Sequence, residues 1–166
     1  MATSNINIEN ATIAFRNFSG KEGKFNPAGR RNFCVILDQD ISNVLVEDGW
    51  NVKYLRPRNE DELPQPYIQV AVNYKNIPPK IVLITSSGKT TLDENTVSML
   101  DWAEISNVDL IVRPYNYEVN GKTGVKAYCK SMYVTIEEDE FEKKYSDVPD
   151  SAVNSLMEEQ MDDIPF

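Results

Sequence analysis

Apolar and polar residues alternate along much of this chain, and this period of two predicts β-strands rather than long helices. The alternating segments are also rich in β-branched and aromatic residues, which favour strands. Seven segments follow this pattern: 11–18, 31–37, 50–56, 67–74, 80–85, 108–118 and 125–136. Many short strands within one unit are typical of a small barrel or a sandwich, so we expect a mainly β fold.

Two segments follow a helical period instead. In the first, between Asp40 as candidate N-cap and Gly49 just past the last turn, three apolar residues share a face: Ile41, Val44 and Leu45. In the second, residues 93–103, the apolar stripe consists of Val97, Leu100 and Ala103. We therefore expect one or two short helices among the strands. Both tryptophans, Trp50 and Trp102, are expected in the core.

The net charge of −9 is confined to the C-terminal part of the chain. Residues 137–166 contain 11 acidic and 2 basic residues, whereas residues 1–136 contain 15 of each. Because residues 137–166 also lose the β-branched alternation, we expect a disordered acidic tail there and one folded domain over residues 1–136. Within that domain, cations cluster in residues 16–31 and 113–130. Basic patches on a neutral domain are suited to a polyanionic partner.

The segment 120–124, Asn-Gly-Lys-Thr-Gly, predicts a β-hairpin, because Asn-Gly tolerates the positive φ angles of a tight turn. An even-numbered connection, with Val119 opposite Gly124, places three pairs of side chains on one face of the hairpin. These pairs are Tyr117 with Lys126, Tyr115 with Tyr128, and Arg113 with Lys130. The opposite face then collects Leu110, Val112, Pro114, Ala127, Cys129 and Tyr133 as core residues. A slip of two residues would preserve this division.

Three tyrosines and three cations on one surface are suited to single-stranded nucleic acid. Unpaired bases stack on aromatic rings for about 1–3 kcal/mol each, whatever the base. Lys and Arg side chains bind the phosphates, which makes the affinity depend on salt. Such surfaces occur in OB-folds, which are small Greek-key barrels, so we expect an OB-like small β-barrel. The alternative interpretation is that these tyrosines are amphipathic surface residues or a homo-oligomer interface.

A second candidate element runs from Arg16 to Phe33 and combines glycines, cations and aromatic rings. Glycines give a loop the freedom to close over a DNA strand, and the cations would meet its phosphates. The candidate DNA-binding residues of this element are Arg16, Phe18, Lys21, Lys24, Phe25, Arg30 and Arg31. The alternative is a solvated surface loop with Phe18 and Phe33 in the core. A third, weaker cluster comprises Lys53, Tyr54, Arg56 and Arg58, which could equally be a salt-bridged edge.

The last residues of the chain combine carboxylates with a rigid proline and a terminal aromatic: Asp162, Asp163, Ile164, Pro165 and Phe166. Proline lacks an amide donor, so this tip is suited to a partner's pocket rather than to a helix or a sheet. It resembles the C-terminal tip of bacterial single-stranded DNA-binding proteins (SSBs). Because the rest of the chain does not align with the bacterial core and lacks a Gly/Gln/Pro-rich linker, it looks more like SSBs encoded by bacteriophages.

This resemblance implies a protein that binds single-stranded DNA during DNA replication, recombination or repair. It also implies that the tip recruits proteins of these processes. As a tethered polyanion, the tail would compete with DNA for the basic face at low salt. The alternative is a decoy that copies the SSB tip to capture replication proteins without binding DNA. The predicted hairpin surface argues against a decoy, which has no need of it.

The sequence argues against an enzyme. It contains no histidine, which excludes His-dependent triads and most catalytic zinc sites. Gly-Lys-Thr triplets begin at Gly88 and Gly121, but neither has the earlier glycine of a phosphate-binding loop. A two-metal nuclease is a further alternative, although the acidic residues lack a recognisable spacing. We expect no cofactor or metal, two buried thiols at Cys34 and Cys129, no membrane segment, and a cytoplasmic location, in the host cell if a phage encodes the protein.

Overall fold

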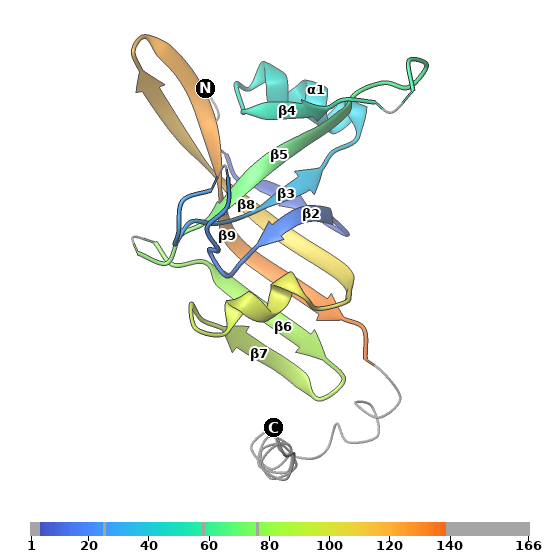
Figure 1. The fold of residues 1–166 in the computed structure, drawn as a ribbon, viewed down its shortest axis with the longest axis vertical. Coiled ribbons are helices and arrows are strands. Elements are labelled where there is room, and N and C mark those ends of the chain that lie inside the picture. Colours follow the sequence, from blue (N-terminus) through green and yellow to red (C-terminus); the bar gives the residue numbers. More distant parts are fainter. Residues whose placement is uncertain (1–3, 25, 58, 76, 139–166) are drawn as a thin grey trace.

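The structure is a computed structural model that describes residues 4–24, 26–57, 59–75 and 77–138. Strands dominate this part of the chain, so the prediction of a mainly β fold is confirmed (Figure 1). The strands are β1 (Ile6–Ile8), β2 (Thr12–Asn17), β3 (Arg31–Ile36), β4 (Val52–Leu55), β5 (Gln65–Val72), β6 (Lys80–Thr85), β7 (Gly88–Leu92), β8 (Ile105–Val119) and β9 (Lys122–Ile136). The helices are α1 (Gln39–Glu47) and the 3-10 helix η1 (Val97–Asp101).

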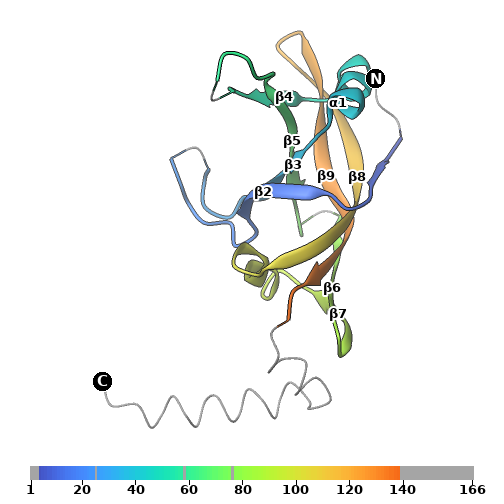
Figure 2. The ribbon, with the colours of Figure 1, turned by 90° about the vertical axis from the view of Figure 1, so that its right-hand side faces the viewer.

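These strands form one sheet whose main path is β1-β8-β9-β5-β3-β2, with β4 paired to β5 and β6 paired to β7 and β9. Neighbours are antiparallel except that β9 runs parallel to both β5 and β6. Among the described residues the path does not close, so the sheet is open rather than the closed barrel that was expected. Its end strands, β1 and β2, are consecutive in the chain, which turns between them (Figure 2). Between these strands the chain stays attached to β8, because the Ala11 N–H donates to the Val108 carbonyl at 2.7 Å.

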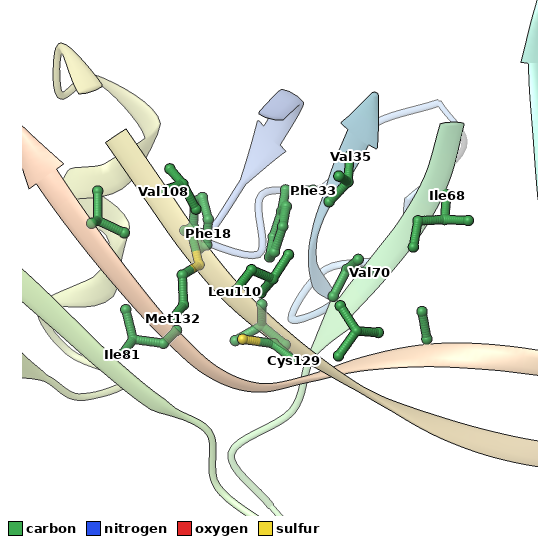
Figure 3. Close-up of a cluster of buried hydrophobic side chains, with 14 of the residues drawn as sticks. Phe18, Phe33, Val35, Ile68, Val70, Ile81, Val108, Leu110, Cys129 and Met132 are labelled. Carbon is green, nitrogen blue, oxygen red and sulfur yellow. The ribbon is translucent and has the colours of Figure 1, made fainter. Parts of the chain in front are cut away.

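The core lies on the inner face of the sheet, which carries alternate buried residues of β5, β8 and β9 together with Phe33 and Val35 of β3 (Figure 3). Phe18, just after β2, and Phe33 on β3 are both fully buried, and their stacked rings have centroids 5.1 Å apart. Truncating a buried Phe to Ala costs about 3–5 kcal/mol in typical cores. We call the opposite side of the sheet the outer face. It carries the intervening residues, among them Asn32, Gln69, Ala71 and Tyr128.

Helix α1 begins two residues earlier than the sequence pattern indicated. Its N-cap is Asp38 rather than Asp40, because the Asp38 carboxylate accepts the Ile41 N–H at 2.7 Å. Asp40 lies in the first turn instead, where a carboxylate also interacts well with the helix dipole. Gly49 follows the helix with φ of 87°, as expected for a residue that ends a helix. In the described part of the chain, no helix is long and apolar enough to cross a membrane.

The second expected helix, over residues 93–103, is reduced to the single 3-10 helix η1. The Asp93 carboxylate accepts the N–H groups of Asn95 and Thr96 at 2.9 and 3.0 Å, and this local turn replaces the first helical turn. Trp102, at the end of η1, is 75% exposed, so its expected place in the core is wrong. Trp50 is buried, as expected.

Two strands were missed by the sequence pattern. β1 has only three residues, too few to show a period. β7 has the sequence Gly-Lys-Thr-Thr-Leu, in which Leu92 alone is buried. It forms because it pairs with the apolar strand β6 across a tight turn at Ser86 and Ser87. When the partner strand supplies most of the buried surface, a strand does not need alternating apolar residues of its own, so its sequence does not predict it.

Candidate nucleic-acid interface

The β8–β9 hairpin carries the residues on which the sequence prediction depends. Asn120 and Gly121 form its two-residue turn, with φ of 52° and 79°, and Val119 pairs with Lys122. The connection is therefore even-numbered, as predicted, but the register differs by two residues from the predicted pairing. The observed pairs are Tyr117 with Gly124, Tyr115 with Lys126, and Arg113 with Tyr128. A shift of two leaves these side chains on their predicted face.

Lys130 lies at an irregularity in the pairing of β8 with β9, between the paired residues Cys129 and Ser131. A bulge of this kind reverses which residues of a strand face the core. Tyr133, which the sequence pattern placed in the core, therefore lies on the outer face. There the Nζ atom of Lys80 is 5.9 Å from the centre of its ring.

Four hairpin residues form what we call the ring–cation cluster: Arg113, Tyr115, Lys126 and Tyr128. The rings of Tyr115 and Tyr128 meet edge to face, with centroids 5.9 Å apart and planes at 81°. The Tyr128 ring also has Cζ of Arg113 at 5.3 Å and Nζ of Lys126 at 5.1 Å from its centre. Tyr115 is 52% exposed. One ring is therefore open to solvent while its neighbour holds two cations beside it.

Tyr117 lies on the same face of the hairpin but is engaged within the protein. Its hydroxyl accepts a 2.9 Å hydrogen bond from the side-chain amide of Asn51. Gly124 makes room for the ring, since a Cβ at that position would lie 2.5 Å from the Tyr117 hydroxyl oxygen. The backbone N–H of Asn51 also donates to the Val125 carbonyl at 3.0 Å. Tyr117 and Asn51 thus tie the hairpin to the segment that precedes β4.

A groove of about 530 Å³ lies beside the cluster on the outer face, over β3, β5 and β9. Lys126 and Tyr128 line this groove as well, so the groove and the ring–cation cluster form one continuous surface. The charged residues that line it are five cations and one carboxylate: Arg30, Arg31, Lys53, Lys75, Lys126 and Glu94. This excess of positive charge in a concave site attracts a polyanion.

Arg31 and Tyr74 pack against each other in the groove. The Arg31 guanidinium is 5.6 Å from the centre of the Tyr74 ring, and its Nη2 donates to the Glu94 carbonyl at 3.3 Å. Arg31 Nε and Tyr74 Oη are buried and lack a hydrogen-bond partner among the described residues. Burial raises the pKa of Tyr74 to about 12, so its hydroxyl keeps its proton. Both atoms are therefore donors that a phosphate oxygen or a water molecule would satisfy.

The loop between β2 and β3 is held in shape by asparagine side chains. The Asn26 side-chain amide donates, at 3.0–3.2 Å, to three backbone carbonyls of the loop, those of Lys21, Pro27 and Arg30. These hydrogen bonds join residues at both ends of the loop in this structure. It presents three exposed cations of the predicted set: Lys21, Lys24 and Arg30. Phe25, a further predicted contact, lies outside the described residues.

Arg16 and Phe18, both predicted DNA contacts, do not join this surface. Phe18 is fully buried against Phe33, so its assignment as a DNA contact is wrong; the ring completes the core instead. The Nη1 atom of Arg16 donates to the carbonyls of Leu100 and Ala103 at 2.9 and 2.8 Å. Arg16 thus satisfies the C-terminal carbonyls of η1.

The predicted docking tip lies outside the described residues: Asp162, Asp163, Ile164, Pro165 and Phe166. The last described residues follow the end of β9 that is remote from the hairpin turn (Figure 1). There the Glu137 N–H donates to the Glu104 carbonyl at 2.7 Å, and the Glu138 carboxylate accepts hydrogen bonds from Ser86.

Among the residues of this surface that the sequence analysis did not single out are Asn51, Tyr74 and Lys75. No local pattern marks them, because the pairing of β5 with β9 and of Trp50 with Val125 brings them to the groove. Lys53 belonged to the weaker third cluster of the sequence analysis and proves to line the groove.

The chain is similar in fold to solved structures of one phage protein, the single-stranded DNA-binding protein from bacteriophage Enc34. Its complex with single-stranded DNA aligns with a TM-score of 0.54 and 11% identity, over 81% of this chain and 88% of that one. A C-terminal truncation of it gives a TM-score of 0.52 over 81% and 87% of the two chains, and a further structure gives 0.53 over 81% and 82%, both at 11% identity. At this identity the likeness concerns the fold alone.

No curated protein sequence is significantly similar to the chain. The model of one protein family, described as the putative phage ssDNA-binding domain, matches residues 1–165. With nearly its whole length matched, the chain belongs to the family of putative phage ssDNA-binding domains.

Proposed function

We propose that this protein binds single-stranded DNA on its outer face, with little sequence preference. The ring–cation cluster holds bases and phosphates at the hairpin, and the adjoining groove guides the backbone. Membership of the phage ssDNA-binding family supports this proposal, as does the likeness in fold to an SSB that was solved in complex with single-stranded DNA.

The observation that carries the proposal is the Tyr128 ring with Arg113 and Lys126 within 5.3 and 5.1 Å of its centre, beside the exposed ring of Tyr115. Bases stack on aromatic rings for about 1–3 kcal/mol each. Cations at such distances meet the phosphates on either side of a stacked base. Stacking requires an unpaired base, so this arrangement favours single strands over duplex DNA. It uses the π-face that all bases share, so it discriminates little between sequences.

The groove extends this contact along the phosphate backbone. Lys53 and Lys75 would bind phosphates as point charges, and Arg30 and Arg31 as planar donors. The exposed cations of the β2–β3 loop, Lys21 and Lys24, would add contacts outside the groove.

We further propose that the acidic tail recruits proteins of DNA replication, recombination or repair through its tip, and that the tail competes with DNA at low salt. The charge of residues 137–166 and the resemblance of the tip to those of bacterial SSBs support this part of the proposal. Truncation after Tyr145 should leave DNA binding intact or tighter and should abolish capture of partner proteins. Weaker DNA binding by the truncated chain would contradict this scheme.

Titration with oligo-dT, followed by intrinsic fluorescence at several salt concentrations, tests the DNA-binding function. The expected result is a fluorescence change with an affinity that falls as salt rises, and much weaker binding of duplex DNA. A decoy that copies an SSB tip would give no response. A control with Mg²⁺ and end-labelled DNA should show intact oligonucleotide, whereas digestion would favour a nuclease.

A further inference from the structure

Phe15 combines an exposed ring with an unfavourable backbone conformation. Its side chain is 65% exposed and its φ is 49°, in the left-handed region that residues other than glycine and asparagine rarely adopt. It lies where the pairing of β2 with β3 is irregular, between Ala14 and Asn17. Strain of this kind persists where the surrounding structure enforces it, and it concentrates at functional positions.

The Phe15 ring lies beside the ring of Tyr67. Their centroids are 6.5 Å apart and their planes are inclined by 55°. Because β3 separates β2 from β5, the Phe15 ring must reach across β3 to make this approach. Tyr67 is on the outer face, since its chain neighbours Pro66 and Ile68 are buried in the core. The two rings therefore form a pair on the same face as the groove.

A short path along β5 joins this pair to the ring–cation cluster. Tyr67, Gln69 and Ala71 follow one another on the outer face, and Ala71 pairs with Tyr128. Tyr67 and Ala71 are four residues apart, about 13 Å at the rise of a β-strand. Lys53 pairs with Tyr67, lines the groove and donates to Gln69 at 3.4 Å. A cation thus lies between the two aromatic sites.

We propose that Phe15 and Tyr67 form a second base-stacking site for the same DNA strand, an inference that rests on the proposed function. A strand held at the ring–cation cluster crosses the groove along β5, places a phosphate near Lys53 and stacks an unpaired base on Phe15. At the ~3.4 Å spacing of stacked nucleotides, about four of them span the distance, and fewer do if the strand is stretched. The left-handed backbone at Phe15 sets the direction in which its ring leaves the strand.

Phe15→Asn tests the site, because asparagine tolerates the left-handed backbone and lacks the ring. Affinity is measured by fluorescence anisotropy for dT oligomers of increasing length at one salt concentration. Phe15→Asn and Tyr67→Ala should bind the shortest competent oligomers like the wild type and longer ones about tenfold more weakly. Phe15→Trp, which keeps a ring, should bind long oligomers like the wild type.

Tyr54→Ala is the matched control. Tyr54 belonged to the weaker third cluster of the sequence analysis, but the structure separates it from the groove. It is an exposed aromatic on β4, next to Lys53 in sequence, and it is directed to the other face of the strand and does not line the groove. Its removal should leave the affinity for all lengths unchanged, and thermal melts should show that each variant folds.

Two results would overturn the second site. One is wild-type affinity of Phe15→Asn for every length, while Tyr128→Ala binds more weakly; the proposed function would then stand without this site. The other is a loss of stability with an equal loss of affinity at all lengths, which would assign Phe15 a structural role. Wild-type affinity in Tyr128→Ala as well would instead contradict the proposed function itself.

Discussion

The guanidinium carbon of Arg113 lies 5.3 Å from the centre of the Tyr128 ring, and the two residues are paired across β8 and β9. Their pairing follows from the two-residue turn at Asn120 and Gly121, which sets the register of the whole hairpin. A slip of one residue would put the ring and the cation on opposite faces. The turn therefore decides whether one nucleotide can stack its base on Tyr128 while Arg113 binds its phosphate.

Arg113→Ala should weaken oligo-dT binding about tenfold at low salt, because a charged contact to phosphate is lost. It should also reduce the slope of log affinity against log salt by about 0.7, the value for one phosphate contact on a single strand. Titrations at four or more salt concentrations measure both effects. Lys89→Ala, on β7 and away from the groove, serves as control and should change neither. An unchanged slope in Arg113→Ala would remove this residue from the phosphate contacts.

Gly124→Ala should detach the hairpin from the segment before β4. The added methyl group would lie 2.5 Å from the Tyr117 hydroxyl and 2.7 Å from Oδ1 of Asn51, so their hydrogen bond cannot persist. We expect the free energy of unfolding to fall by about 1–3 kcal/mol, as for other overpacked sites. Faster hydrogen exchange at the Asn51 amide would localise the effect.

Gly23→Ala is the matched control for this change. A Cβ at Gly23 meets nothing within 4 Å, so the substitution should leave both stability and exchange unaltered. Equal stability of the Gly124→Ala and Gly23→Ala proteins would contradict the proposed link between Tyr117 and Asn51.

Arg16→Ala should destabilise the fold without affecting the affinity of the folded protein for DNA. Its guanidinium donates to two carbonyls of the η1 turn, and hydrogen bonds from charged groups contribute about 1.5–3 kcal/mol. Urea denaturation measures the stability, and oligo-dT titration without urea measures the affinity of the folded protein, so the two effects are separated. Lys21→Ala should show the reverse, with full stability and weaker binding. Weak DNA binding by a fully stable Arg16→Ala protein would show instead that Arg16 contacts DNA.

Stability should fall in alkali because two buried groups resist losing their protons. Burial raises the pKa of Cys129 from 9.0 to about 12, and burial raises that of Tyr74 from 10.0 to about 12. Above pH 9 the thiol ionises in the unfolded state but stays neutral in the folded state. The unfolded state therefore binds fewer protons, and the free energy of unfolding falls as the pH rises. The buried Cys129 thiol lowers the free energy of unfolding by up to about 1.4 kcal/mol per pH unit. Tyr74 contributes less, because its side chain is only partly buried and solvent screens it.

Urea denaturation between pH 8 and 11 measures this dependence. Cys129→Ala should be somewhat less stable at pH 8, through loss of packing, and should lose less stability than the wild type from pH 9 to 11. Tyr74→Phe should flatten the curve only above pH 10. Parallel curves for all three proteins would show that these groups are not responsible.

The sequence sufficed for the hairpin because its signals are local. An Asn-Gly turn and strict alternation on both strands place Tyr115, Lys126 and Tyr128 on one face, even though the predicted register differed by two residues. The same alternation failed at Tyr133, since a bulge at Lys130 reverses the period and a bulge leaves no mark on the composition of a strand.

The groove was beyond sequence reasoning for a different reason. It depends on the parallel pairing of Ala71 with Tyr128, residues far apart in the chain, and on the packing of Arg31 against Tyr74. Such contacts are decided by the tertiary fold. The burial of Phe18 was missed for the same reason. Its neighbours include cations and glycines, which are typical of a surface loop, but the tertiary fold places its ring in the core.

The most direct test of the central claim is the affinity of a Tyr115→Ala/Tyr128→Ala double variant for oligo-dT at fixed salt, beside the Tyr54→Ala control. If bases stack on this cluster, the folded double variant should bind at least about tenfold more weakly. Its salt dependence should stay unchanged because every cation remains, and Tyr54→Ala should match the wild type. A folded double variant that binds oligo-dT as tightly as the wild type would contradict the account.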